Sequence, residues 1–137
     1  MLTIEDYFGR ISFVQYGKPS PEIYANAGIL VSRVNRLFDL VLAVRPDLEV
    51  AREPKVNSGW RPPAYNATIP NAAIRSKHMT GEAIDLSDPE GELDELLLDN
   101  IGLLQGAELW MEHPLATKGW CHLQCVPPKS GNRVFYP

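Results

Sequence analysis

The stretch SKHMTGEAIDL, residues 76–86, sets both the predicted fold and the predicted chemistry of this chain. Its second half predicts a strand, because it is a short run bounded by a glycine. On a strand, Asp85 and Ala83 share one face, and the small Ala83 leaves room beside the carboxylate. Gly81 allows a sharp turn, so His78 on the preceding loop can fold over the same face. The stretch therefore brings an imidazole and a carboxylate together.

Further short runs between glycine, proline and asparagine also predict strands, and the four predicted strands are residues 55–58, 82–86, 107–112 and 120–125. Apolar residues three and four apart predict helices at residues 21–45 and 89–99. The fold class that follows is α+β, with a small, largely antiparallel sheet and helices packed on one side. Residues 61–77 form a long predicted loop with one helical turn, and loops of this length are often functional.

The longer predicted helix has clear signals at both ends. Ser20 can cap it, Pro21 suits the first helical position, and the helix ends at Arg45, before a proline. Its apolar stripe consists of Ile23, Ala27, Leu30, Val31, Val34, Phe38, Val41 and Leu42. This stripe predicts that the helix covers one face of the sheet. The shorter helix takes Ser87 or Asp88 as its predicted cap.

Length and composition indicate one globular domain, residues 1–137, with 45% hydrophobic and 22% charged residues and a formal net charge of -4. An acidic chain without a basic stripe does not predict nucleic-acid binding. The most apolar stretch, residues 29–44, is interrupted by Arg33, Arg36 and Asp39, so we expect no membrane insertion. The first residues show no secretory signal, and we expect synthesis in the cytoplasm.

The two cysteines, Cys121 and Cys125, lie four residues apart in a predicted strand. Four strand residues span about 13 Å, whereas a disulfide needs Cα atoms within roughly 7 Å. We therefore expect two free thiols that serve as small buried hydrophobic residues, with metal ligation as the lesser alternative.

The residues His78, Asp85 and His122 form a candidate metal-binding set. Two neutral imidazoles and one carboxylate suit a catalytic zinc ion, which commonly takes three protein ligands and keeps a fourth position open. Alternation along the last predicted strand puts His122 on one face together with Trp120 and Gln124. Cys121 points the other way and is not expected to be a ligand.

The order of these residues forms a recognisable pattern. Residues 76–85 read Ser-x-His-x-x-Gly-x-Ala-x-Asp, and residues 120–122 read Trp-x-His. This pattern resembles the zinc D-Ala-D-Ala carboxypeptidase and L-alanyl-D-glutamate endopeptidase family, peptidoglycan peptidases whose fold is similar to the hedgehog signalling domain. Residues 58–62, SGWRP, followed by Asn66, resemble the family's Ser-Gly-aromatic-Arg segment. The resemblance covers residues 56–124, about half of the chain.

The resemblance implies that the candidate set binds one zinc ion per chain and that water activated by zinc attacks a peptide carbonyl. It implies that Arg61 contacts a substrate carboxylate or a carbonyl oxygen near the metal, for which its planar charged fork is suited. Ser76 would add a hydrogen bond to the substrate. Trp60, beside Arg61, is a candidate for lining the substrate groove, although core packing is the simpler interpretation.

The catalytic base does not follow the best-known family pattern. Several relatives carry Glu or Asp three residues before the last metal ligand, where this chain has Gly119. The nearest upstream carboxylate is Glu112, at the end of the third predicted strand. A hairpin through residues 113–118 would bring it beside His122, so we assign Glu112 as the base. His113 is the alternative, as a base or as a transition-state donor.

The expected function is therefore that of a zinc metallopeptidase acting on the stem peptides of bacterial peptidoglycan. It would be of the D-Ala-D-Ala carboxypeptidase or L-Ala-D-Glu endopeptidase type. Small size without a signal favours a monomeric bacteriophage endolysin or virion-associated lysin that reaches the cell wall after release, although an acidic chain gains no attraction to an anionic wall. Two alternatives remain, a catalytically inactive zinc-binding module on the same fold and an iron site, for which no cosubstrate pattern is present.

Overall fold

The computed structural model describes all of residues 1–137. Five strands form one sheet in the order β1-β2-β4-β3-β5. Their bounds are β1 Val56–Ser58, β2 Ala83–Asp88, β3 Trp110–Glu112, β4 Gly119–Gln124 and β5 Val134–Phe135. The α+β class is confirmed, but the sheet is mixed. The C-terminal segment, which was not predicted as a strand, adds β5 parallel to β3, while the other pairs are antiparallel.

The long central pair of strands, β2 and β4, fixes which side chains share a face. Asp85 lies opposite His122, and Leu86 lies opposite Cys121. Because side chains alternate along a strand, the sheet has one polar and one apolar face. The apolar face contributes the fully buried residues Ile84, Leu86, Met111, Cys121 and Leu123.

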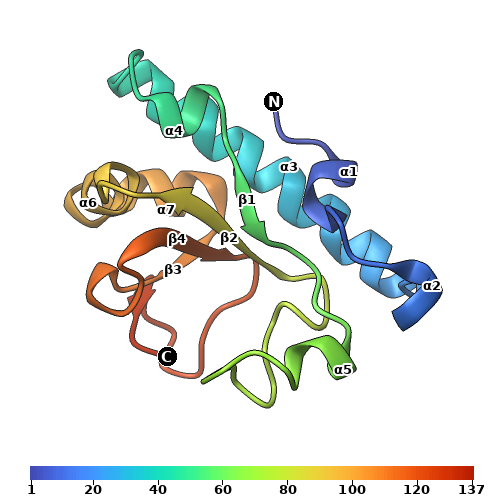
Figure 1. The fold of residues 1–137 in the computed structure, drawn as a ribbon. Coiled ribbons are helices and arrows are strands. Elements are labelled where there is room, and N and C mark those ends of the chain that lie inside the picture. The colour runs from blue at the N-terminus through green and yellow to red at the C-terminus, as the bar shows by residue number, and fades with distance from the viewer.

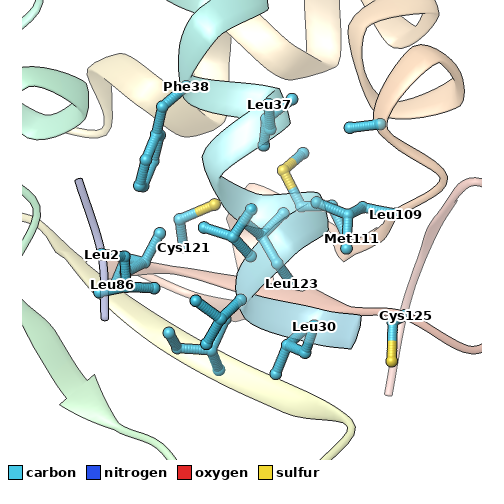
Figure 2. Close-up of a cluster of buried hydrophobic side chains, with 14 of the residues drawn as sticks. Leu2, Leu30, Leu37, Phe38, Leu86, Leu109, Met111, Cys121, Leu123 and Cys125 are labelled. Carbon is cyan, nitrogen blue, oxygen red and sulfur yellow. The ribbon is translucent and has the colours of Figure 1, made fainter. Parts of the chain in front are cut away.

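Helix α3 (Pro21–Val44) packs its apolar stripe into the same core as the apolar face of the sheet. The Ser20 hydroxyl accepts a hydrogen bond from the Ile23 N–H at 3.2 Å, which confirms the predicted cap. Its buried residues are Ala27, Leu30, Val31, Val34, Leu37, Phe38 and Val41. Figure 2 shows side chains of this helix and of the sheet in one cluster. The predicted role of the helix is confirmed.

The helix predicted at residues 89–99 is α6 (Glu92–Asp99), and a second, unpredicted helix follows it, α7 (Ile101–Ala107). Helix α6 begins late because Gly91 adopts a left-handed conformation, with φ 69°. The N-cap is Gly91 and not the predicted Ser87 or Asp88. The Asp88 carboxylate nevertheless accepts hydrogen bonds from the N–H groups of Leu93 and Asp94, in the first turn, at 3.2 and 2.9 Å. The predicted strand start at residue 107 was wrong, because α7 extends to Ala107 and β3 begins only at Trp110.

Short helices that the sequence pattern did not predict complete the fold: α1 (Ile4–Phe8), α2 (Phe13–Tyr16), α4 (Glu49–Arg52) and the 3-10 helix η1 (Pro114–Ala116). The helical turn expected in the long loop is α5 (Pro63–Asn66). Helix α1 is tied to the sheet, because the Tyr7 hydroxyl donates to the Ala83 carbonyl at 3.0 Å. Figure 1 shows α1 and α2 beside α3, with α4 before the start of β1 and α5 beyond its end.

Cys121 and Cys125 are buried free thiols, as predicted. Cys121 lies on the apolar face of β4 and belongs to the hydrophobic core. Burial raises the pKa of the Cys121 thiol well above its ordinary value, so it stays protonated. No helix of the chain combines the length and the apolar character needed to cross a membrane.

Candidate metal centre

The fold brings the three predicted metal ligands together on the polar face of the sheet. Their candidate ligand atoms all lie within 4.8 Å of one another, and all three residues are buried. Asp85 comes from β2 and His122 from β4, directly opposite each other in the register. His78 comes from the turn that leads into β2. The predicted convergence of His78, Asp85 and His122 is confirmed.

His78 is held from two sides. Its Nδ1 lies 2.8 Å from the Gly59 carbonyl, which can only accept, so Nδ1 carries a hydrogen and Nε2 is the nitrogen available to a metal ion. That Nε2 lies 3.3 Å from Asp85 Oδ2. Gly59 fits here because any Cβ would collide with the Tyr7 backbone. The Ser76 hydroxyl accepts a hydrogen bond from the His78 N–H at 3.2 Å.

The turn before β2 depends on Gly81, as predicted. Its φ is 78°, in the left-handed region that favours glycine, and a Cβ would lie 2.8 Å from the Ile23 carbonyl oxygen. The turn that carries His78 therefore packs closely against α3.

The Asp85 carboxylate is the centre of the cluster. Oδ1 lies 2.8 Å from His122 Nδ1, and Oδ2 accepts a hydrogen bond from Arg61 Nη2 at 3.1 Å. Burial alone would raise the pKa of Asp85, but the hydrogen bonds with His122 and His78 outweigh it and hold that pKa well below its usual range. The carboxylate is therefore ionised at neutral pH and available as a ligand.

The pKa of His122 is shifted by the same contact with Asp85. Burial would lower its pKa, but the hydrogen bond and charge of Asp85, with the charge of Glu112, outweigh burial and raise the pKa. Without a metal, a proton lies between the imidazole and Asp85. Two imidazole nitrogens and one carboxylate at this spacing are a suitable donor set for a divalent metal ion, which would displace that proton.

Arg61 lies beside the candidate metal set. Its Nε donates to the Ser58 hydroxyl at 2.8 Å, its Nη2 donates to Asp85, and it lines the cleft around the metal set. Ser76 also lines this cleft.

Trp60 does not reach the cleft. It is 4% exposed, its Nε1 donates to the Met79 carbonyl at 3.1 Å, and its ring packs against Phe8 and Phe13. It instead lines a separate cavity of about 600 Å³, together with residues of α1, α2 and β1. The structure therefore gives Trp60 a packing role.

Glu112 faces the cleft from β3, with its Oε1 3.8 Å from His122 Nε2. Burial raises its pKa, although the charge of His122 opposes the shift. The alternative base, His113, does not line the cleft. Its Nδ1 accepts a hydrogen bond from the Leu115 N–H at 3.1 Å, and its ring stacks on Tyr136 with centroids 4.6 Å apart.

The cleft has a volume of about 740 Å³ and includes residues outside the predicted site. Gln124 contacts His122, and the Phe135 ring lies 6.4 Å from the His122 ring. Strand alternation had placed Gln124 on the His122 face, which is the signal that could have revealed it. Phe135 gave no such signal, because β5 is only two residues long. Arg75 and Lys77 also line the cleft.

Comparisons with protein-family models, with curated proteins and with solved structures found no match to this chain.

Proposed function

We propose that the chain is a zinc-dependent peptidase that hydrolyses peptide bonds in the stem peptides of bacterial peptidoglycan. The observation that carries the proposal is the buried set of His78, Asp85 and His122 with a fourth group, Glu112, in the same cleft. The set fits zinc, which commonly takes three nitrogen and oxygen ligands and leaves a position open. The family resemblance of the motifs supports the peptidoglycan substrate.

In this proposal, Glu112 and Arg61 act on the substrate beside the metal ion. Zinc, when bound, supplies a Lewis acid that polarises the peptide carbonyl and makes water more acidic. Glu112 accepts the proton of the attacking water and returns it to the leaving amine as the C–N bond breaks. A carboxyl whose pKa is raised by burial suits both steps. Arg61 stabilises negative charge on the former carbonyl oxygen or holds a substrate carboxylate.

The charges around the cleft favour an anionic peptide, although the chain as a whole has a net charge of -4. Arg75 and Lys77 are exposed, line the cleft and form no ion pair. Local charge at a cleft, more than net charge, attracts a small substrate. The stem peptides of peptidoglycan carry carboxylates, so the acidic chain is no obstacle to this substrate.

The proposal also concerns the bond that is cleaved and the setting in which the protein acts. The bond cleaved is either the terminal D-Ala-D-Ala bond or the L-Ala-D-Glu bond. A bacteriophage endolysin or virion-associated lysin, acting at the cell wall as a monomer after release, is the setting in which a small domain of this kind would work. The alternative is a catalytically inactive zinc-binding module on the same fold.

Digestion of purified peptidoglycan, followed by mass spectrometry of the fragments, tests the proposal. Zinc-loaded protein should release either D-Ala or fragments cut after L-Ala, and this result also identifies the bond. Glu112→Gln should bind zinc but release neither product. Glu95→Gln, the same change at an exposed residue of α6, is the matched control and should cleave normally.

Absence of cleavage by zinc-loaded wild type would favour the inactive zinc-binding module. Unchanged turnover by Glu112→Gln would show that another group is the base.

A further inference from the structure

Gln124 lies in β4, two residues after His122, and its amide has a partner at each end. The side chain is buried, with the residue 4% exposed. Its Oε1 lies 3.0 Å from His122 Nε2. Its Nε2 donates a hydrogen bond to the Val126 carbonyl at 2.8 Å. The amide therefore connects a metal-ligand candidate to the backbone just beyond the strand.

These contacts fix the orientation of the amide. The Val126 carbonyl can only accept a hydrogen bond, so the NH₂ group of Gln124 must face it. The amide oxygen then faces His122, and hydrogen bonding to an oxygen requires a hydrogen on His122 Nε2. When a metal ion displaces the proton between Nδ1 and Asp85, the imidazole keeps its remaining hydrogen on Nε2, and Nδ1 presents its lone pair. Nδ1 is the atom that lies 2.8 Å from Asp85 Oδ1.

The contact between Gln124 and His122 also determines whether Glu112 can accept a hydrogen bond from His122. Its Oε1 lies 3.8 Å from His122 Nε2, which is too far for a hydrogen bond. Gln124 is the closer acceptor for that hydrogen, at 3.0 Å. If Gln124 were absent, the Glu112 carboxylate would be a competing acceptor for this hydrogen. The amide therefore leaves Glu112 free to exchange protons with other groups in the cleft.

We propose that Gln124 is a positioning residue that holds His122 in the Nε2–H tautomer and so presents Nδ1 to the metal. By accepting the Nε2 hydrogen itself, Gln124 also keeps Glu112 free of a hydrogen bond from His122. The proposal rests on the zinc-binding part of the proposed function and is independent of its substrate. A group that hydrogen-bonds the outer nitrogen of a histidine ligand orients that ligand, and losing such a group typically weakens metal binding by about 10- to 100-fold.

Zinc affinity, measured by competition with a chelator, tests the proposal directly. Gln124→Met keeps a similar volume but removes both hydrogen bonds, so its dissociation constant for zinc should rise about 10- to 100-fold. Gln124→Glu keeps an acceptor toward His122 and should bind zinc more tightly than Gln124→Met. Leu123→Met, on the apolar face of the same strand, is the matched control and should bind zinc like the wild type.

Long-range ¹H–¹⁵N NMR spectra of the zinc-loaded protein give a second readout that does not depend on activity. The wild type should show the hydrogen of His122 on Nε2 and that of His78 on Nδ1, where it faces the Gly59 carbonyl. Gln124→Met should leave the His78 signals in place and lose the protected His122 Nε2–H signal. His78 thus serves as the internal control.

Wild-type zinc affinity in Gln124→Met, with unchanged His122 signals, would overturn the proposal. If Gln124→Met does not fold, Gln124→Glu provides the test. The His122 Nε2–H signal must persist in Gln124→Glu, and loss of that signal would equally overturn the proposal. A wild-type chain that binds no zinc would overturn the zinc-binding function itself, which separates the two failures.

Discussion

At the residue scale, Arg61 depends on geometry as well as on charge. Its Nε and Nη2 donate to Ser58 and Asp85 at 2.8 and 3.1 Å, from two positions of one rigid plane. A lysine keeps the charge but cannot reproduce both contacts of the planar fork.

Arg61→Lys should therefore lower kcat/KM for a stem peptide substrate. Loss of one charged hydrogen bond costs about 1.5–3 kcal/mol, which corresponds to roughly 10- to 100-fold in rate. Steady-state hydrolysis of a synthetic stem peptide measures the effect. Arg75→Lys, at an exposed residue of the same cleft without such contacts, is the control and should retain most of the activity. Near-normal kinetics for Arg61→Lys would give Arg61 a structural role only.

At the element scale, the turn into β2 depends on its packing against α3. Gly81→Ala should destabilise the protein by about 2 kcal/mol, because alanine is strained at positive φ and its Cβ would meet the Ile23 carbonyl oxygen. The substitution should also weaken zinc binding, since the turn carries His78. Gly28→Ala, within α3 itself, meets no atom within 4 Å and should stabilise by about 0.5–1 kcal/mol. Urea unfolding measures both effects, and equal effects would contradict the close approach.

A second contact between elements links α6 to the residue after η1. Asp94 of α6 is 2% exposed, and its Oδ2 accepts a hydrogen bond from the Thr117 hydroxyl at 2.9 Å. Burial raises the pKa of Asp94 to about 6, against about 3.9 in an unfolded chain. Because the folded pKa is the higher one, the stability from this group is complete below about pH 4 and is lost as the pH rises through about 6.

Asp94→Asn removes this titration while keeping an oxygen for Thr117. Relative to the wild type, the variant should therefore gain about 1–3 kcal/mol between pH 4 and pH 8. Urea unfolding at both pH values gives the difference. Asp39→Asn, at an exposed position of α3, should change stability little at either pH. An Asp94→Asn effect that does not vary with pH would mean that the buried carboxyl does not titrate in this range.

The sequence predicted those elements whose signals are local. Ser20, Pro21 and the apolar stripe predict α3, because a cap and a 3.6-residue period are properties of the segment itself. Alternation predicted that Asp85 shares a face with Ala83 and that His122 shares one with Trp120 and Gln124, and the register of β2 and β4 puts Asp85 opposite His122. The metal set could therefore be predicted from local pattern together with the family resemblance.

The remaining features depend on contacts between distant segments. Strand β5 has two residues and exists through its pairing with β3, so it leaves no periodic signal. Trp60 is a packing residue because its partners, Phe8 and Phe13, come from helices that the sequence did not predict. The orientation of the Gln124 amide depends on the Val126 carbonyl, a backbone group that a residue pattern does not reveal.

At the scale of the whole molecule, the metal set joins β2, β4 and the turn before β2. A ligand that binds only the folded chain at 1,000 times its dissociation constant adds about 4.1 kcal/mol of stability. Bound zinc should accordingly raise Tm by roughly 10–15 °C. Elemental analysis should find one zinc per chain, and chelation should abolish peptidase activity. An active protein free of metal would contradict the proposed mechanism.

The size of this zinc effect should depend on pH in a direction set by His122. Despite burial, the contacts with Asp85 raise the His122 pKa in the metal-free fold. The stability from this group is therefore complete below about pH 6.5, the unfolded value, and is lost as the pH rises through the folded pKa. Zinc has to displace that proton, so zinc binding strengthens over the same range.

Thermal unfolding with zinc and with chelator should thus give Tm values that diverge as the pH rises from 5.5 to 8.5. His122→Ala should remove the difference at every pH. His113→Ala is the matched control, because His113 stacks on Tyr136 outside the cleft, and it should preserve the divergence. A difference that stays constant with pH would show that zinc displaces no proton, and His122 would then not be the ligand that the geometry indicates.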